Sequence, residues 1–254
     1  MNHTASMTAV EDIPAIEHDE WMQLATVELD RLIDALAGLS PEQWRAPTPC
    51  AGWDVRAMAG HLLGMMRLGA DRGELQRQIG EATRRLEAAG GYRIDHLTGL
   101  QVEEHAGLTT NDLLEEMRLV APRAIAGRAG WTEEERAAPY VPGPPFDGEW
   151  TRGYLFGCIH TRDPWLHRTV DIASATGESP TLSAEHDGRI VADVVAEWAR
   201  RHGQACTLVL TGPAGGTYSS GEDGERHELD AVQFCRLLSG RGTGAGLLAY
   251  SIPF

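Results

Sequence analysis

The sequence predicts an α+β protein in which a four-helix bundle over residues 18–178 is followed by a small α/β domain over residues 179–254. Segments with apolar residues at helical spacing follow one another through the first 177 residues, with no convincing strand between them. Beyond residue 180 the composition changes to a strand-like run, glycine-rich turns and short amphipathic stretches. Residues 1–17 are polar and acidic, and we expect them to form a flexible tail.

Helical spacing defines the first helix of the bundle. From Trp21 onward, apolar residues recur at three- and four-residue intervals, and Gly38 ends the run. Ser40-Pro-Glu-Gln43 then has the pattern of another helix start, with a hydroxyl cap, a proline at the first helical position and a glutamine that reaches back. The segment Pro47–Trp53 that follows predicts a rigid connection, because it combines prolines with a glycine.

The next helix carries the first candidate functional residue. We expect Asp54 to cap it, and its apolar positions form a stripe with His61 at the edge. Taken alone, such a histidine is more typical of a hydrogen-bonded boundary residue than of a metal ligand. Gly60 and Gly64 lie four residues apart on this helix, which allows another segment to approach it closely.

The remaining elements follow from the same signals. In the bundle we expect an amphipathic stretch from Leu75 to Leu86, a helix capped at Thr109 or Thr110 that extends to Ile125, and, after the loop Pro139–Pro145, a long helix from about Thr151 to Ala175. In the C-terminal domain we expect a helix over Glu185–His202, a strand over Cys206–Leu210, a short helix capped by Asp230 and a final buried strand over Leu247–Ile252.

Composition excludes several function classes. A net charge of −15 leaves no basic stripe for nucleic-acid phosphates and disfavours an anionic membrane surface. The chain contains no lysine, which excludes Schiff-base chemistry and a lysine general base. The four cysteines form no C-x-x-C pair, so a zinc ribbon is excluded and a reducing compartment is favoured. With neither a signal-peptide pattern nor a membrane-length apolar run, we expect a cytoplasmic protein.

A second segment offers more ligands. His160, Asp163 and His167 are spaced three and four residues apart, so their side chains line one helix face. Two imidazoles and a carboxylate suit a divalent transition metal, and His61 from another helix would complete a three-ligand site with one open position. The alternative is a solvated helix face with weak surface pairs, although the neighbouring residues are apolar and aromatic. Pro164 either kinks the helix beside these residues or marks its end.

Two arginines are candidates for anion binding, because no lysine is available. Arg236 and Arg241 flank a short C-terminal helix, and both are candidates to bind a carboxylate of a cofactor or substrate. Arg241 is the better candidate, since it lies in a loop just past Gly240. The alternative is that these cations only complement a helix C-terminus. Cys50 lies in the loop before the His61 helix, which leaves open a thiol near the metal.

Three segments resemble the mycothiol-dependent maleylpyruvate isomerase-like family, a branch of the DinB-like metal-binding four-helix bundles. They are P-T-P-C-A-G-W-D-V-R…G-H-L from Pro47 to Leu62, T-R-D-P-W-L-H-R from Thr161 to Arg168, and A-V-Q-F-C-R-L-L-S-G-R…G-L-L-A from Ala231 to Ala249. The resemblance implies His61, Asp163 and His167 as zinc ligands and an arginine, Arg241, facing the substrate. Asp163 departs from the family pattern, which has a glutamate there, so zinc, nickel and iron stay open and His160 is a candidate substitute or neighbour of the ligands.

The resemblance also implies the function. Zn²⁺ or another divalent metal would accept the thiol of mycothiol, a low-molecular-weight cofactor or co-substrate, for attack on a small electrophilic, carboxylate-bearing substrate. The enzyme would be an isomerase or a thiol S-transferase, with His160 as a candidate proton carrier because an ordinary histidine titrates near neutral pH. One alternative is a non-catalytic, metal-bearing bundle that binds a small ligand or partner protein. Another is a metal-free bundle with His61 far from His167. The chain is expected to be a monomer or homodimer.

Overall fold

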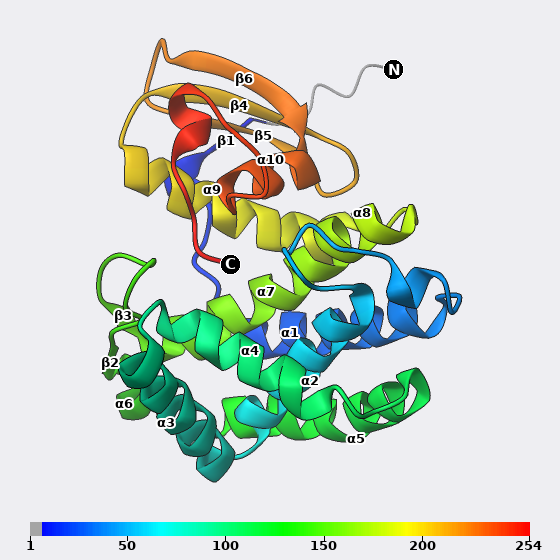
Figure 1. Cartoon of the computed structure of the whole chain (residues 1–254). Helices are drawn as coiled ribbons and strands as arrows, with labels where there is room; N and C mark the ends of the chain where they lie inside the picture. The colour runs from blue at the N-terminus through cyan, green and yellow to red at the C-terminus, as the bar shows by residue number, and fades with distance from the viewer. Residues whose placement is uncertain (1–6) are drawn as a thin grey trace. The chain divides into compact units, whose positions relative to one another are not determined.

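The described residues, 7–254 of this computed structural model, divide into two units. The bundle unit consists of His18–Glu178, and the sheet unit combines residues 7–17 with Ser179–Phe254 (Figure 1). The first unit is almost entirely helical and the second contains a mixed sheet, so the predicted α+β class is confirmed. Within the described residues, no helix combines the length and the apolar character needed to cross a bilayer.

Four helical segments make up the core of the bundle unit: α1 (His18–Ala37), α2 (Val55–Ala70), α5 (Thr110–Ala129) and the long segment from Tyr154 to Thr176. Their buried side chains include Leu32, Leu36, Met58, Leu63, Leu113 and Met117. Asp54 caps α2 by accepting a hydrogen bond from the amide of Ala57 at 2.8 Å, as the sequence predicts. The cap and the apolar stripe together set the rotation of α2, which places His61 inside the unit.

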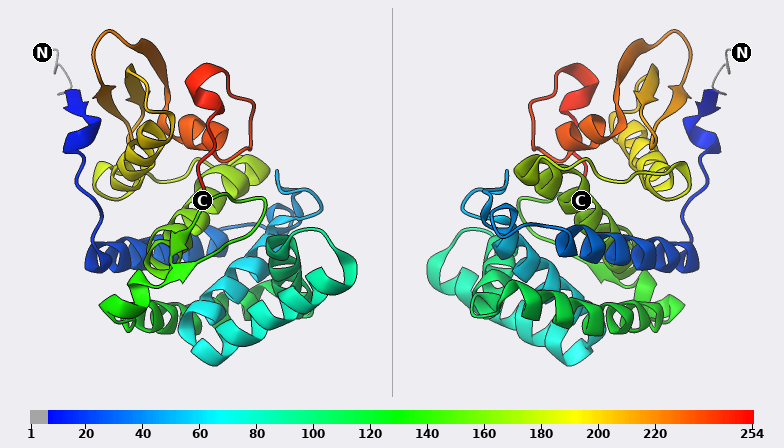
Figure 2. Two further views of the ribbon diagram at one scale, coloured as in Figure 1. Left: turned by 90° about the vertical axis from the view of Figure 1, so that its left-hand side faces the viewer. Right: turned by 90° about the vertical axis from the view of Figure 1, so that its right-hand side faces the viewer.

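A helical hairpin packs on α2. It consists of α3 (Arg72–Ala89) and α4 (Arg93–His105), and Figure 2 shows it along one side of the bundle unit. Helix α4 has no side-chain cap and few apolar residues, and the sequence analysis did not predict it. Shorter elements complete the unit: η2 (Gln43–Arg45), α6 (Glu133–Ala137) and the two-stranded β2 (Pro139–Tyr140) and β3 (Trp150–Thr151).

The predicted helix start at Ser40 is only partly correct. Ser40 and Gln43 form the expected reciprocal bonds, from the Ser40 amide to Gln43 Oε1 at 2.9 Å and from the Gln43 amide to Ser40 Oγ at 3.3 Å. The structure continues them only into the single turn η2. Pro47 and Pro49 follow at once, and a proline disfavours helical conformation at the residue before it.

The long segment continues as a helix through Pro164. It consists of η3 (Tyr154–Ile159), α7 (His160–Leu166), η4 (His167–Ile172) and α8 (Ala173–Thr176), in which η3 and η4 are wide π-helical turns. Pro164 has no N–H, so the carbonyl of His160 lacks its intrahelical donor. Arg128 of α5 donates to that carbonyl at 3.2 Å and also to those of Phe156 and Gly157. Pro164 therefore does not end the helix.

The sheet unit is built on four strands: β1 (Met7–Ala9), β4 (Cys206–Thr211), β5 (Gly216–Ser220) and β6 (Glu225–Asp230), in the order β1-β5-β4-β6. Strand β4 is antiparallel to β5 and parallel to β6, and β1 is parallel to β5. Its helical elements are η1 (Val10–Asp12), η5 (Ala184–Gly188), α9 (Arg189–His202), α10 (Ala231–Leu238) and η6 (Gly246–Ala249). Trp198 of α9 packs edge-on against Phe234 of α10, with ring centroids 5.3 Å apart.

Two predictions about this unit are wrong. A flexible tail was expected over residues 1–17, but Met7–Ala9 within it form a strand that pairs with β5. Residues 1–6 of the expected tail lie outside the described residues. The expected strand Leu247–Ile252 is absent, and η6 begins at Gly246, which has a left-handed backbone with φ +57°. The carbonyl of Leu247 accepts from Trp198 Nε1 at 2.9 Å and from the amide of Tyr250, so a neighbouring strand does not use it.

Candidate metal centre

The structure brings His61, Asp163 and His167 together inside the bundle unit. His61 lies in the middle of α2, Asp163 in α7, and His167 begins η4. The Nε2 atom of His61 is 3.5 Å from Oδ2 of Asp163, and the Nε2 atom of His167 is 3.3 Å from Oδ1 of the same carboxylate. The two imidazole rings have centroids 5.4 Å apart. This contradicts the alternative in which the two histidines lie far apart.

The spacing of these donors fits a metal ion. In a tetrahedral site with bonds of about 2.0–2.1 Å, two donors lie about 3.4 Å apart, close to the 3.3 Å and 3.5 Å found here. Among the described residues, nothing donates a hydrogen bond to Oδ2 of Asp163, although this atom is buried. Buried carboxylate oxygens without a donor are rare and call for an ion or a water. The three residues therefore fit a divalent metal.

Each imidazole is oriented by a partner at its other nitrogen. The Nδ1 atom of His61 is 2.7 Å from Oε1 of Gln101, and the Nδ1 atom of His167 is 2.7 Å from Oδ2 of Asp171. An amide oxygen and a carboxylate oxygen only accept, so both Nδ1 atoms carry the proton. The Nε2 atoms toward Asp163 are then the ones that offer a lone pair to a metal.

The charges of the group are strongly coupled. Burial alone would raise the pKa of Asp163, but the positive charge on His167 and its hydrogen bond to the carboxylate outweigh burial and hold that pKa well below its usual range. Burial alone would lower the pKa of His167, but Asp163 and Asp171 outweigh it and raise that pKa well above its usual range. The site therefore stabilises a positive charge next to Asp163, and a metal cation would supply that charge instead of a proton.

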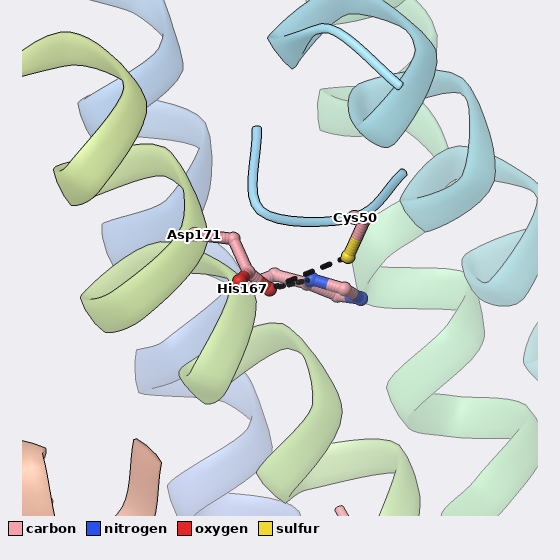
Figure 3. A group of neighbouring side chains, drawn as sticks. All are labelled: Cys50, His167 and Asp171. Carbon is pink, nitrogen blue, oxygen red and sulfur yellow. Dashed lines mark hydrogen bonds and ion pairs between the residues drawn. The ribbon is translucent and has the colours of Figure 1, made fainter. Parts of the chain in front are cut away.

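Cys50, His167 and Asp171 form a second group whose donor atoms lie within 4.8 Å of one another. Figure 3 shows Cys50 on its loop, with its sulfur directed toward the carboxylate of Asp171 at a distance of 3.8 Å. The 2.7 Å between His167 Nδ1 and Asp171 Oδ2 is a hydrogen bond and is too short for two ligands of one metal. We interpret Cys50 and Asp171 as residues that surround and orient His167. The Cys50 thiol therefore lies next to Asp171 and is not one of the three candidate ligands.

His160 does not join either group of possible ligands among the described residues of the bundle unit. Its ring lies edge-on to Phe156, with centroids 4.9 Å apart. Burial, and next the positive charge of Arg128, lower the pKa of His160 to about 3. With its pKa so lowered, the imidazole of His160 is neutral in the fold near pH 7. Its role as a proton carrier stays a prediction.

Arg236 and Arg241 belong to the sheet unit, where they bond to each other through the turn after α10. The amide of Arg241 donates to the carbonyl of Arg236 at 3.1 Å, and Nε of Arg236 donates to the carbonyl of Arg241 at 3.3 Å. Arg236 is exposed and Arg241 is half-buried. Their role in binding a carboxylate stays a prediction.

A buried ion pair beside the site escaped the sequence analysis. Arg168 of η4 binds Glu28 of α1 through two hydrogen bonds, Nε to Oε1 at 2.6 Å and Nη2 to Oε2 at 2.8 Å. Glu28 is fully buried, and Arg168 nearly so. A glutamate on the apolar face of the first helix is the signal that could have revealed this pair, because buried carboxylates need a partner. The pair fixes η4 against α1 next to His167.

A family model and two solved structures match this chain. Residues 25–173, more than half of the chain, match the family model described as the mycothiol maleylpyruvate isomerase N-terminal domain. Two solved structures are similar in fold: a mutant of the mycothiol-dependent maleylpyruvate isomerase, with a TM-score of 0.57 and 14% identity, and the isomerase itself, with 0.54 and 15%. Each likeness covers 93% of this chain and 93% of the other chain. No curated protein matches in sequence.

Proposed function

The chain belongs to the mycothiol maleylpyruvate isomerase family, and on that premise we propose that it is a zinc-dependent enzyme that uses mycothiol. It would act as an isomerase or a thiol S-transferase on a small electrophilic substrate. The observation that carries the proposal is the buried cluster of His61, Asp163 and His167, whose donor atoms are spaced as metal ligands and whose carboxylate oxygen lacks a donor. Fold alone supports only the relationship, since one fold serves many substrates.

The three candidate ligands would hold the metal through two neutral imidazole nitrogens and one carboxylate. A zinc ion bound there supplies the positive charge that lowers the pKa of a thiol and keeps it as the reactive thiolate. Three protein ligands leave one position for that thiol, which distinguishes a catalytic zinc site from a structural one. Asp171 and Gln101 keep the proton on Nδ1 of each histidine, so that Nε2 is available.

Exposure indicates from where a small thiol would approach. The side chains of His61 and His167 are each only 4% exposed, whereas that of Asp163 is 18% exposed. A thiol would therefore reach the site past the carboxylate of Asp163. The proposal keeps Arg241, together with Arg236, as the candidate for the substrate or cofactor carboxylate, because the guanidinium group can bind a carboxylate with two parallel hydrogen bonds.

The experiment combines metal analysis with thiol chemistry. Protein purified without an affinity tag is analysed for bound metal and then incubated with mycothiol and a panel of electrophiles that includes maleylpyruvate. We expect about one zinc for each chain and metal-dependent turnover. Isomerisation would leave the thiol concentration unchanged, and transfer would consume one thiol for each product. Asp163→Ala should lose both metal and turnover, and Asp34→Ala, at an exposed position of α1, is the matched control.

Two negative results have different meanings. Zinc binding without turnover of any electrophile would contradict the enzymatic proposal and leave the non-catalytic, metal-bearing bundle. Protein that binds no divalent metal at micromolar concentration would contradict both.

A further inference from the structure

Helices α2 and α4 approach each other closely at two glycines. A Cβ atom added at Gly64 would lie 2.5 Å from Cγ and 2.6 Å from Cβ of Gln101, and one added at Gly60 would lie 3.2 Å from Cβ of His105. The glycine pair predicted to permit a close neighbour therefore has one, and that neighbour is α4. The approach is what brings the amide of Gln101 to His61, one helical turn from Gly64.

A chain of buried side-chain amides leads away from His61. Nε2 of Gln101 donates to Oε1 of Gln78 at 2.8 Å, and Nε2 of Gln78 donates to the carbonyl of Gly64 at 3.1 Å and to Oε1 of Glu74 at 2.8 Å. Both glutamines are fully buried. A buried amide that lost its partners would cost about 1–3 kcal/mol for each unsatisfied group, so the chain holds a defined arrangement.

The donor and acceptor roles in this series of hydrogen bonds follow from its end farthest from His61. The carbonyl of Gly64 and the carboxylate of Glu74 can only accept hydrogen bonds, so they require the NH₂ group of Gln78 to face them. The oxygen of Gln78 then faces Gln101 and requires its NH₂ group. The oxygen of Gln101 is left for His61 and requires a proton on Nδ1. Each hydrogen bond in this series joins a donor to an acceptor, and only one arrangement of the two amides satisfies all of these bonds.

We propose that Gln101 and Gln78 are positioning residues that fix the tautomer of His61, keeping the proton on Nδ1 and leaving Nε2 unprotonated for the metal. The inference rests on the proposed metal site. Gln101 does for His61 what Asp171 does for His167, but with a neutral amide whose orientation is imposed by Gln78. Without an acceptor at Nδ1, the imidazole is free to place its proton on Nε2, where it blocks coordination.

The test measures zinc affinity and the position of the proton in the full-length protein. Zinc dissociation constants come from competition with a fluorescent chelator, and two-bond ¹H–¹⁵N spectra of protein labelled with ¹⁵N-histidine distinguish protonated from unprotonated ring nitrogens. The His61 signals are assigned from their loss in His61→Gln. The variants are Gln101→Leu, which removes the acceptor, and Gln101→Glu, which keeps an acceptor of nearly the same size. Gln76→Leu, at an exposed position two residues from Gln78, is the matched control.

We expect Gln101→Leu to raise the zinc dissociation constant by about 10-fold to 100-fold, the usual effect of removing the partner of a ligating histidine. Its His61 should show protonated Nε2. Gln76→Leu should bind zinc as the unsubstituted protein does. Gln101→Glu should keep the proton on Nδ1, and its zinc affinity should fall less than that of Gln101→Leu, because it keeps the acceptor for His61 and loses only the donor to Gln78. Gln78→Leu should have an intermediate effect, because Gln101 can then turn its amide over.

The inference is overturned if His61 of the unsubstituted, metal-free protein carries its neutral-form proton on Nε2, a result that needs no variant to fold. It is also overturned if Gln101→Leu binds zinc with unchanged affinity, or if Gln101→Glu is weakened as much as Gln101→Leu. These results differ from failure of the proposed function, in which the unsubstituted protein itself binds no zinc.

Discussion

Gly64→Ala tests the contact on which the orientation of His61 depends. The added Cβ would lie 2.5 Å from Cγ and 2.6 Å from Cβ of Gln101, whereas carbon atoms pack at about 3.5–4.0 Å. The position of Cβ is fixed by the backbone of α4, so rotation of the side chain cannot relieve its overlap at 2.6 Å. Helix α4 must move by about 1 Å, which stretches the 2.7 Å bond between His61 and Gln101 beyond hydrogen-bond range.

The change in the free energy of unfolding caused by Gly64→Ala has three parts. Overpacking costs about 1–3 kcal/mol and the lost hydrogen bond about 1 kcal/mol. Alanine has a higher helix propensity than glycine, which stabilises the variant by about 1 kcal/mol. We therefore expect a net loss of about 1–3 kcal/mol, and about 2–4 °C of melting temperature for each kcal/mol in a protein of this size. Zinc affinity should fall in the same variant because His61 loses its acceptor.

Gly80→Ala is the matched control. Gly80 lies in the exposed part of α3, and a Cβ there meets no atom within 4 Å. This substitution should raise the melting temperature, because only the helix-propensity gain of about 1 kcal/mol remains. Thermal melts followed by circular dichroism give the melting temperatures of both variants, and zinc titrations give their affinities. If Gly64→Ala melts as high as Gly80→Ala and binds zinc normally, the reasoning about the contact between α2 and α4 is refuted.

Three further predictions concern the surroundings of the site. Asp171→Asn should weaken zinc binding about 10-fold, because the amide holds Nδ1–H of His167 less firmly than the carboxylate; unchanged affinity in chelator competition would contradict this. Arg128→Met removes the hydrogen bonds to three helix carbonyls, of which that of Gly157 keeps a second donor in the hydroxyl of Thr161, and should cost at least about 2 kcal/mol, measured by urea unfolding. The lowered pKa of His160, about 3 in the fold, means that the unfolded chain binds the proton first as the pH falls. The free energy of unfolding should therefore fall as the pH is lowered from 6.5 toward 3. His160→Gln should reduce that fall by about 1.4 kcal/mol for each pH unit. Curves of unfolding free energy against pH that run parallel for the two proteins would contradict the burial of His160.

The bundle helices were predictable because their signals are local. The caps at Asp54 and Thr109 and the apolar stripes appear directly in the sequence and are confirmed. The spacing of Asp163 and His167 on one helix and the presence of His61 on another made a shared site a specific expectation. The approach of both histidines to within 3.5 Å of the Asp163 carboxylate depends on how the helices pack, which only the structure shows.

What escaped prediction depended on partners that are distant in sequence. Helix α4 begins at Arg93, the preceding Tyr92 provides no side-chain cap, and the helix includes only a few apolar residues. The sequence therefore predicted no element to hold Gln101. Gln78 looks like a surface residue of α3 until α4 covers it. In the sheet unit, β6 is largely polar and forms a strand because it pairs with β4. The strand predicted over Leu247–Ile252 failed for the converse reason, since Trp198 uses a backbone carbonyl of that segment.

The most direct test of the central claim is anomalous diffraction from a crystal of the protein grown with zinc and recorded on both sides of the zinc absorption edge. The account predicts one strong peak, about 2.0–2.2 Å from Nε2 of His61, a carboxylate oxygen of Asp163 and Nε2 of His167. A peak bound instead by Cys50 and Asp171, or a map with no peak near Asp163, would contradict it.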